Sequence, residues 1–274
     1  MDAGIVRDMP QRLANSGGPE LNVTCNTHNS RHLAPGQVDI WLTSTKTLSA
    51  DTLHCYKTVL SAPELERWQR IIVPDARLQF LIARTLLRAS LSQYAAVRPV
   101  EWRFETNAYG KPFVANPKLC CDLRFNLSHT KHLVAVAVTN GCEVGVDVEY
   151  LRQHVDFVQL APVVFAPAEL NAFRAVPEQQ RAGLFWTLWT LKEAYIKALG
   201  TGLSCSLDSF AFDVSETHPC ISFEKRCTDA PSGWQFRHYA LTPEHMLALA
   251  VAAPDAFFDA RLIWTVPEIL YPIK

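Results

Sequence analysis

Two acidic side chains, Asp147 and Glu149, are separated by a single residue in the alternating segment 144–149. This alternation predicts a β-strand, and on a strand that spacing places both carboxylates on the same face. Neighbouring carboxylates repel each other unless a cation lies between them, and a few hard oxygen ligands suit Mg²⁺ bound together with a phosphate-bearing substrate. Alternating acids are also common on solvent-facing strands. The pair alone therefore leaves a metal site and an ordinary surface equally open.

A third carboxylate and a lysine share one face of a predicted helix. Within residues 186–200, Trp189, Glu193 and Lys197 follow one another at intervals of four, beside an apolar stripe. A Glu and a Lys at this spacing are by default a solvated pair that contributes about 0.2–0.5 kcal/mol. Placed beside the two strand acids, however, they would give three carboxylates and a lysine, a combination suited to phosphate chemistry.

Polar residues that could bind phosphate also occur in two predicted turns. Lys111 lies at the tip of the turn 109–112, and Ser128 and His129 lie at the end of a strand pattern. Adjacent turns of one sheet would bring the three together as a cradle for a phosphate monoester, although a lone histidine is more often a satisfied structural residue. The sequence contains no P-loop, GxGxxG, GxSxG or HExxH motif, which excludes the commonest nucleotide-binding, hydrolase and zinc-protease sites.

A helical apolar pattern upstream carries two arginines, Arg84 and Arg88, four residues apart. Two arginines on one helix can bind phosphate. A pair of exposed, solubilising charges is the ordinary alternative, and the helix alone does not decide between them.

The composition limits the class of protein. The 274 residues are 49% hydrophobic and 19% charged, which suits one large folded unit or two fused smaller ones. Lys and Arg number 26 against 27 for Asp and Glu, so we expect neither nucleic acid nor an anionic membrane as a partner. The eight cysteines include no CxxC pair, and no apolar run approaches the roughly 20 residues that cross a bilayer. We therefore expect a cytoplasmic protein in a reducing compartment.

The chain divides into a tail and two halves. Residues 1–36, rich in Asn, Gly, Ser and Pro, predict a flexible tail with no assigned function. In residues 37–142, and again in residues 143–274, helical patterns are followed by short, closely spaced strand patterns typical of an antiparallel sheet. No linker rich in Gly, Ser or Pro separates these halves. We expect them to pack as one body with an α+β fold.

Four motifs in this order and spacing resemble those of the 4′-phosphopantetheinyl transferases, specifically the larger class that modifies peptide and polyketide synthetases. The resemblance extends from about Val38 to about Val214, with Thr130 standing where the family usually has a second serine. The motifs are Tyr109-Gly110-Lys111-Pro112, Phe125-Asn126-Leu127-Ser128-His129-Thr130, Gly145-Val146-Asp147-Val148-Glu149 and Trp189-Thr190-Leu191-Lys192-Glu193-Ala194-Tyr195-Ile196-Lys197.

The resemblance implies an α+β fold of two similar halves related by pseudo-twofold symmetry, each an antiparallel sheet packed with helices. Coenzyme A, as substrate, would bind in the cleft between the halves. By analogy, Arg84, Lys111, Ser128 and His129 match positions that hold the nucleotide and its 3′-phosphate. Arg88 is the alternative to Arg84, because the alignment of that helix can slip by one turn.

The resemblance also assigns the reaction. Asp147, Glu149 and Glu193 match the acids that bind Mg²⁺ against the coenzyme A pyrophosphate, and Glu193 is in addition the candidate general base for the attacking serine. Lys197 would neutralise the pyrophosphate and protonate the leaving oxygen, and Lys192 would contact phosphate or stabilise the fold. The products would be a phosphopantetheinylated carrier protein and 3′,5′-ADP.

The implied partner is an acyl or peptidyl carrier protein, and we expect a monomeric enzyme. Exposed apolar residues between Leu151 and Val176 are candidates for docking a carrier helix. The length of the chain argues against the short, trimeric type of holo-acyl-carrier-protein synthase. The alternative in another class is a non-catalytic module of the same fold that binds coenzyme A or a carrier protein. Loss of an acid or lysine would indicate such a module, and none is missing.

Overall fold

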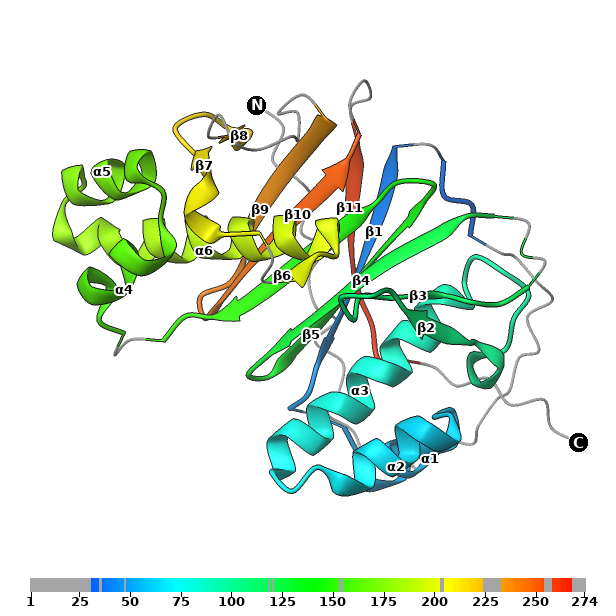
Figure 1. Cartoon of the computed structure of the whole chain (residues 1–274). Coiled ribbons are helices and arrows are strands. Elements are labelled where there is room, and N and C mark those ends of the chain that lie inside the picture. The colour runs from blue at the N-terminus through cyan, green and yellow to red at the C-terminus, as the bar shows by residue number, and fades with distance from the viewer. Residues whose placement is uncertain are drawn as a thin grey trace, which may run out of the picture.

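The computed structural model describes residues 31–267, except 35, 47, 118, 120, 153–154, 203–204, 224–232 and 254–257. The predicted tail 1–36 therefore lies almost entirely outside the described residues. Helices and strands follow one another in two series (Figure 1). The first comprises β1 (Gln37–Ser44), α1 (Ala50–Lys57), α2 (Ala62–Arg70), α3 (Pro74–Leu91), β2 (Phe104–Thr106), β3 (Pro112–Val114), β4 (Leu123–Thr130) and β5 (Leu133–Asn140). The second comprises β6 (Val144–Tyr150), α4 (Phe157–Val164), α5 (Pro167–Ala175), α6 (Glu178–Leu199), β7 (Phe210–Asp213), β8 (Cys220–Phe223), β9 (Trp234–Thr242), β10 (His245–Ala252) and β11 (Asp259–Trp264).

Each series builds a sheet. The first sheet has the strand order β11-β1-β5-β4 and the second has the order β6-β10-β9, while β2 pairs with β3 and β7 with β8. The α+β class with antiparallel sheets is thus confirmed, with one difference. Strand β11, from the second series, pairs parallel to β1 and so extends the first sheet. A strand pattern in the sequence gives neither the partner nor the direction of a strand, so this crossover was not predictable.

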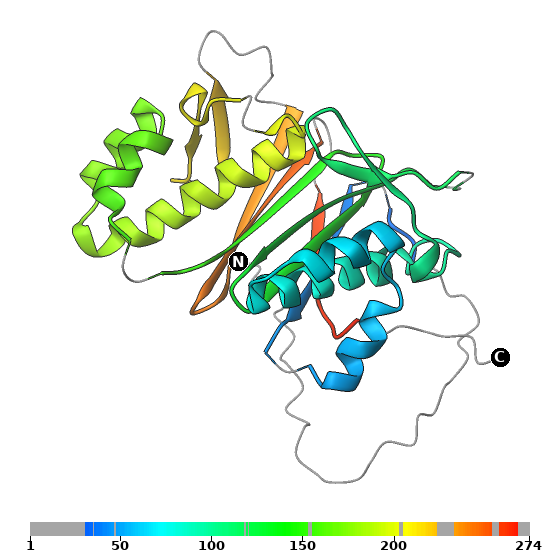
Figure 2. The same ribbon diagram turned by 60° about the horizontal axis from the view of Figure 1, so that its bottom comes forward.

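Among the described residues, three apolar clusters form the core. Helix α3 packs on one face of the first sheet, and α6 packs on one face of the second. The third cluster contains residues of β1, β5, β6 and β10, so it joins the opposite faces of the two sheets. Figure 2 shows α3 and α6 each lying across its own sheet. None of the helices in the described part of the chain has the length and apolar character needed to span a membrane.

The sheets meet where β4 runs beside β6, which are not neighbours in any hydrogen-bonded ladder. Alternate side chains of β4 instead accept hydrogen bonds from backbone N–H groups of β6. The pairs are Asn126 with Val146, Ser128 with Val148 and Thr130 with Tyr150, at 3.0, 3.3 and 3.1 Å. A hydroxyl at residue 130 is all that this seam requires, which explains why threonine serves there.

Helix α6 lies directly on the backbone of β6. Gly145 permits this approach, because a Cβ atom at that residue would lie 2.0 Å from the carbonyl oxygen of Ala194. The helix ends at Leu199, and Gly200 caps it in the left-handed conformation with φ 66°. This close contact places the side chains of α6 that face the seam directly against β6, the strand that carries Asp147 and Glu149.

Candidate active site

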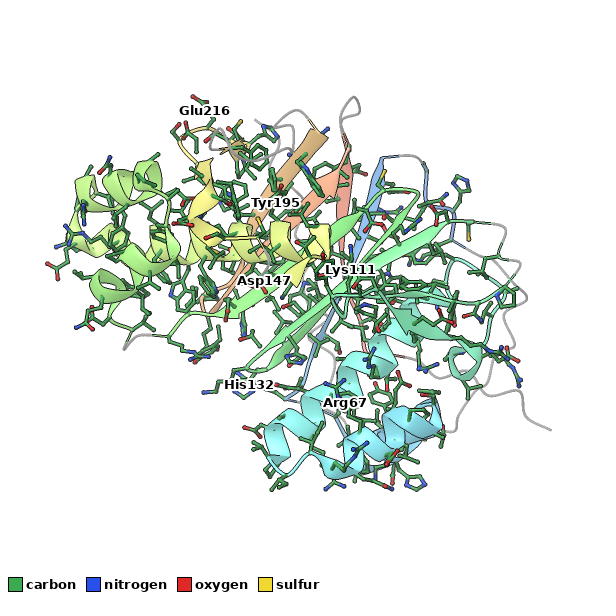
Figure 3. The ribbon with its side chains drawn as sticks, viewed as in Figure 1. Arg67, Lys111, His132, Asp147, Tyr195 and Glu216 are labelled. Carbon is green, nitrogen blue, oxygen red and sulfur yellow. The ribbon has the colours of Figure 1, made fainter. Side chains whose placement is uncertain are left out.

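A lysine, an aspartate and a serine meet at the seam, each from a different element. The ammonium group of Lys197 on α6 donates to Asp147 Oδ1 at 2.6 Å and to Ser128 Oγ at 2.9 Å. The Ser128 hydroxyl also donates to Asp147 Oδ1, at 3.0 Å. Asp147 is buried and Lys197 is partly exposed, so the cluster opens towards solvent on the helix side. Figure 3 places Asp147 at this junction of α6 with the two sheets.

Two further carboxylates adjoin Asp147. The indole N–H of Trp189 donates to Glu149 Oε1 at 3.1 Å. Burial raises the pKa of Glu149, and the charge of Asp147 raises it further. Burial and then Asp147 likewise raise the pKa of Glu193, while Lys197 opposes this increase. The three acids that the sequence placed in one site are therefore close enough to repel one another.

The donor set fits a hard divalent cation in its chemistry. Asp147 Oδ2 is buried and has no hydrogen-bond partner among the described residues, and the acids around it carry raised pKa values. A bound cation would give Asp147 Oδ2 a partner and would lower the pKa values of the neighbouring acids. Within the described ranges, however, no three His, Cys, Asp or Glu side chains form a ready-made metal site. Asp147 Oδ2 would be the oxygen offered to the ion, since Oδ1 already accepts from Lys197.

Two family models match successive parts of the chain. The model of the 4′-phosphopantetheinyl transferase N-terminal region matches residues 47–141, and that of the 4′-phosphopantetheinyl transferase superfamily matches residues 143–252. A 4′-phosphopantetheinyl transferase of Bacillus subtilis is 30% identical over 227 residues, which cover 81% of this chain and 95% of the relative. The chain belongs to the 4′-phosphopantetheinyl transferase superfamily.

Further relatives agree with this assignment. HetI, a 4′-phosphopantetheinyl transferase of Nostoc sp. strain PCC 7120, is 36% identical over 160 residues, covering 58% of this chain and 67% of HetI. Sfp of Bacillus subtilis strain 168 is 27% identical over 216 residues, covering 79% of this chain and 92% of Sfp. Because both halves match models and Sfp aligns over most of its length, the prediction of the larger type of this family is confirmed.

In this transferase the two arginines of α3 have different surroundings. Arg88 is fully buried and donates to Glu64 and to two backbone carbonyls, so it holds α2 and the segment before β2 in place. Arg84 lies 3.5 Å from the same Glu64. Burial lowers the pKa of Arg84, and the neighbouring Arg67 lowers it further. The side chain of Arg84 is 19% exposed against 1% for Arg88, so Arg84 is the arginine that could reach a ligand. Arg67 is a further cation beside it, which no motif in the sequence indicates.

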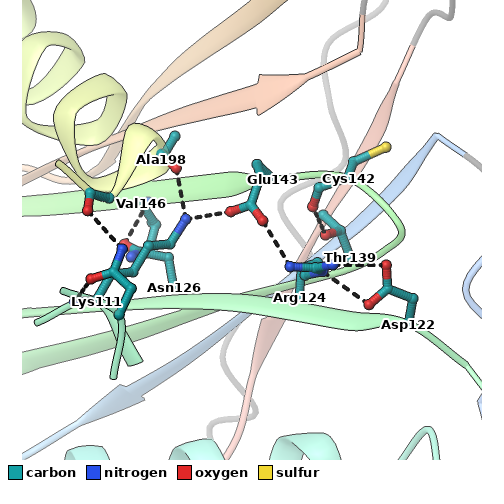
Figure 4. Close-up of polar contacts among 11 residues, drawn as sticks. Lys111, Asp122, Arg124, Asn126, Thr139, Cys142, Glu143, Val146 and Ala198 are labelled. Carbon is teal, nitrogen blue, oxygen red and sulfur yellow. Dashed lines mark hydrogen bonds and ion pairs between the residues drawn. The ribbon is translucent and has the colours of Figure 1, made fainter. Parts of the chain in front are cut away.

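The other expected cofactor contacts are dispersed. His129 is exposed and follows Ser128 on β4, with its side chain on the opposite side of the strand. Lys111 is bonded elsewhere than to the Lys197 cluster: its ammonium donates to Glu143 at 2.5 Å and to the carbonyl oxygen of Ala198 at 2.6 Å (Figure 4). This geometry does not support a direct nucleotide contact by the Lys111 side chain as it stands.

Lys192 is fully enclosed by the fold. Its ammonium pairs with Glu169 at 2.7 Å and donates to the backbone carbonyls of Leu207 and Phe210, each at 2.7 Å. No part of the side chain is exposed, so it cannot touch a bound ligand. Of the two roles considered for Lys192, the structure supports stabilisation of the fold and not the expected cofactor contact.

Proposed function

We propose that this transferase moves the 4′-phosphopantetheine group of coenzyme A to a serine of an acyl or peptidyl carrier protein and releases 3′,5′-ADP. The observation that carries the proposal is the meeting of Lys197, Asp147 and Ser128, with Glu149 and Glu193 beside them, in a member of this family. Both sides of the site come from one chain, so a monomer suffices for the reaction.

The chemistry requires a base, a counter-charge and alignment, because a serine hydroxyl is a weak nucleophile. Glu193, whose pKa burial raises, is suited to take the proton of the carrier serine directly or through a water. The serine oxygen then bonds to the β-phosphorus, and the bond from that phosphorus to the bridging oxygen breaks. Lys197 neutralises the pyrophosphate and supplies a proton to the leaving oxygen.

Asp147, Glu149 and Glu193 would hold Mg²⁺, which when bound neutralises pyrophosphate oxygens and stabilises the charge that develops on them. Two observations support this metal site: Asp147 Oδ2 has no hydrogen-bond partner within the described ranges, and the three acids repel one another. At the nucleotide end, Arg84 and His129 are the proposed contacts of the 3′-phosphate. Arg67 would add a second guanidinium group beside Arg84.

The carrier protein is proposed to dock on α4. Three apolar side chains of this helix, Val158, Leu160 and Val163, are exposed, and they lie within the segment expected to bind the carrier. The helix itself is anchored by Phe157, whose ring packs against Phe185 of α6. Of the three exposed side chains, Leu160 and Val163 lie three residues apart on one side of the anchored helix, an arrangement that suits a partner helix with an apolar face.

The test is to incubate the protein with an apo carrier protein, coenzyme A and Mg²⁺ and to examine the carrier by mass spectrometry. We expect a phosphopantetheine adduct on one serine, and none on a carrier in which that serine is alanine. Chelation of Mg²⁺ by EDTA should stop the reaction and an excess of Mg²⁺ should restore it. Binding of coenzyme A without an adduct on any of several carriers would overturn the proposal and support the non-catalytic module.

A further inference from the structure

The hairpin formed by β2 and β3 contacts the C-terminal end of α6. The side-chain amide of Asn107 donates to the carbonyl oxygen of Gly200 at 2.9 Å, and Lys111 donates to that of Ala198. The last carbonyls of a helix lack partners within the helix and carry its partial negative charge. An amide N–H and an ammonium group are therefore well matched to this helix end.

Lys111 ties this helix end to a third element. Its second acceptor is Glu143, which immediately precedes β6 and also accepts from Arg124 of β4 at 3.0 Å. The lysine thus joins the hairpin, the start of β6 and the end of α6, as Figure 4 shows. Its side chain is only 15% exposed. The contact bridges both halves of the molecule one residue away from Lys197.

The hairpin turn is built to hold these two donors in place. The side-chain oxygen of Asn107 accepts from the backbone N–H groups of Tyr109 and Lys111, each at 2.9 Å. Its amide group is thereby aimed at the helix. The fit is close, because a Cβ atom at Gly200 would lie 2.5 Å from Cδ of Lys111.

We infer that Asn107 and Lys111 are positioning residues, which fix the end of α6 so that Lys197 and Glu193 face Asp147 across the seam. The inference rests on the proposed function. In place of the ligand contact that the resemblance implied, the Lys111 side chain has the role of aligning the helix. Small displacements of a catalytic group cost rate more than binding, so the effect of losing either residue should fall on kcat.

The sharpest variant is Asn107→Asp. The carboxylate keeps an oxygen acceptor for the turn but loses the amide donor, and it places a negative charge against the helix end. We expect kcat to fall about tenfold or more, with the KM for coenzyme A within about twofold of wild type. Glu105→Gln, an exposed residue of the same hairpin, is the matched control and should leave both constants unchanged. Wild-type kcat in Asn107→Asp would overturn the inference.

Lys111 offers a second comparison. Lys111→Met should lower kcat at constant KM for coenzyme A, and Lys111→Arg, which keeps the cation, should recover part of the loss. If the Lys111 side chain instead bound the nucleotide, Lys111→Met would raise that KM and leave kcat intact. Glu143→Gln distinguishes the two roles. It removes the carboxylate charge that holds the lysine, and this should lower the KM for coenzyme A only if the Lys111 side chain contacts the nucleotide. Either of these KM changes would overturn the inference.

A measurement that does not depend on transfer distinguishes failure of the inference from failure of the proposed function. Amide hydrogen exchange should become faster at the end of α6 in Asn107→Asp and stay unchanged in the other helices. Unchanged exchange there would overturn the positioning role even if the enzyme is active. A wild-type protein that modifies no carrier, but shows this local change in the variant, would instead overturn only the proposed function.

Discussion

Helix α6 carries two lysine–carboxylate pairs just over one turn apart, and they have opposite characters. Lys192 and Glu169 lie 2.7 Å apart with neither side chain exposed. Lys197 and Asp147 lie 2.6 Å apart, with the side chain of Lys197 29% exposed and that of Asp147 5% exposed. The distances are nearly equal, so the ion pair itself does not separate a structural role from a functional one.

The difference lies in the remaining hydrogen-bonding capacity of each carboxylate. Glu169 also accepts from the backbone N–H groups of Ala166 and Phe212, at 2.9 and 2.8 Å, so both of its oxygens are used. Asp147 uses one oxygen, and its other oxygen is buried with no hydrogen-bond partner in the described part of the chain, beside two more acids. A buried polar atom without a partner is unfavourable unless a ligand satisfies it. A carboxylate with both oxygens hydrogen-bonded therefore identifies the structural pair, Lys192–Glu169. A carboxylate with one oxygen left over identifies the pair in the site, Lys197–Asp147.

The largest effect should follow from breaking the structural pair. Lys192→Met leaves the Glu169 carboxylate buried without its counter-charge, and we expect the free energy of unfolding to fall by about 3–5 kcal/mol. Urea denaturation measures this change. Lys192→Met combined with Glu169→Gln removes the uncompensated charge and should recover part of the stability. An unchanged urea midpoint in the single variant would show that the pair is not structural.

Breaking the site pair should affect rate and not stability. Asp147→Asn and Glu193→Gln keep the shape of each side chain but remove a charge that the transition state requires, so kcat should fall about 100- to 1,000-fold. The free energy of unfolding of Glu193→Gln should stay the same or rise, because repulsion among the three acids decreases. In Asp147→Asn the loss of the ion pair with the partly exposed Lys197 offsets this gain. Steady-state kinetics and urea denaturation of the same preparations test both halves of this expectation. Near-wild-type turnover with Mg²⁺ present would contradict the site assignment.

The sequence was informative where function depends on local spacing. The alternation of side chains along a strand placed Asp147 and Glu149 on one face of β6. The spacing of four residues along a helix placed Glu193 and Lys197 on one face of α6. The four motifs then identified the family, which both family models confirm. Local spacing could not, however, separate Lys192 from the site, because its burial depends on Glu169 of another helix.

Long-range contacts were the part that the sequence could not give. Arg88 was an alternative to Arg84 as the nucleotide contact until the structure showed it bonded to Glu64 inside the fold. Lys111 looked like a free cation at a turn, yet it caps a helix more than eighty residues away in the chain. In each case the partner is remote in sequence and has no periodic relation to the residue.

Gly145→Ala tests whether the ion pairs Lys192–Glu169 and Lys197–Asp147 depend on the close packing of α6 on β6. The added methyl would meet the Ala194 carbonyl oxygen at 2.0 Å and the Ala198 backbone nitrogen at 2.5 Å, so the helix must shift. Such overpacking should cost about 1–3 kcal/mol of stability. Transfer should weaken further at temperatures where the variant is fully folded, because Lys197 moves with the helix. Calorimetry and kinetics with wild-type values would show that the close approach is not required.

The smallest expected effect concerns the partner of Glu149. Trp189→Phe keeps an aromatic ring but removes the indole N–H that fixes one oxygen of Glu149 and leaves the other available to a cation. Loss of such a supporting hydrogen bond should weaken the apparent affinity for Mg²⁺ about tenfold without unfolding the protein. The Mg²⁺ dependence of transfer, and direct titration with Mn²⁺, both measure this. Trp186→Phe, on the same helix but buried in the apolar cluster, is the control. Equal metal affinities in the two variants would mean that Glu149 needs no orientation, and that the site differs from the structural pair only in its unpartnered aspartate oxygen.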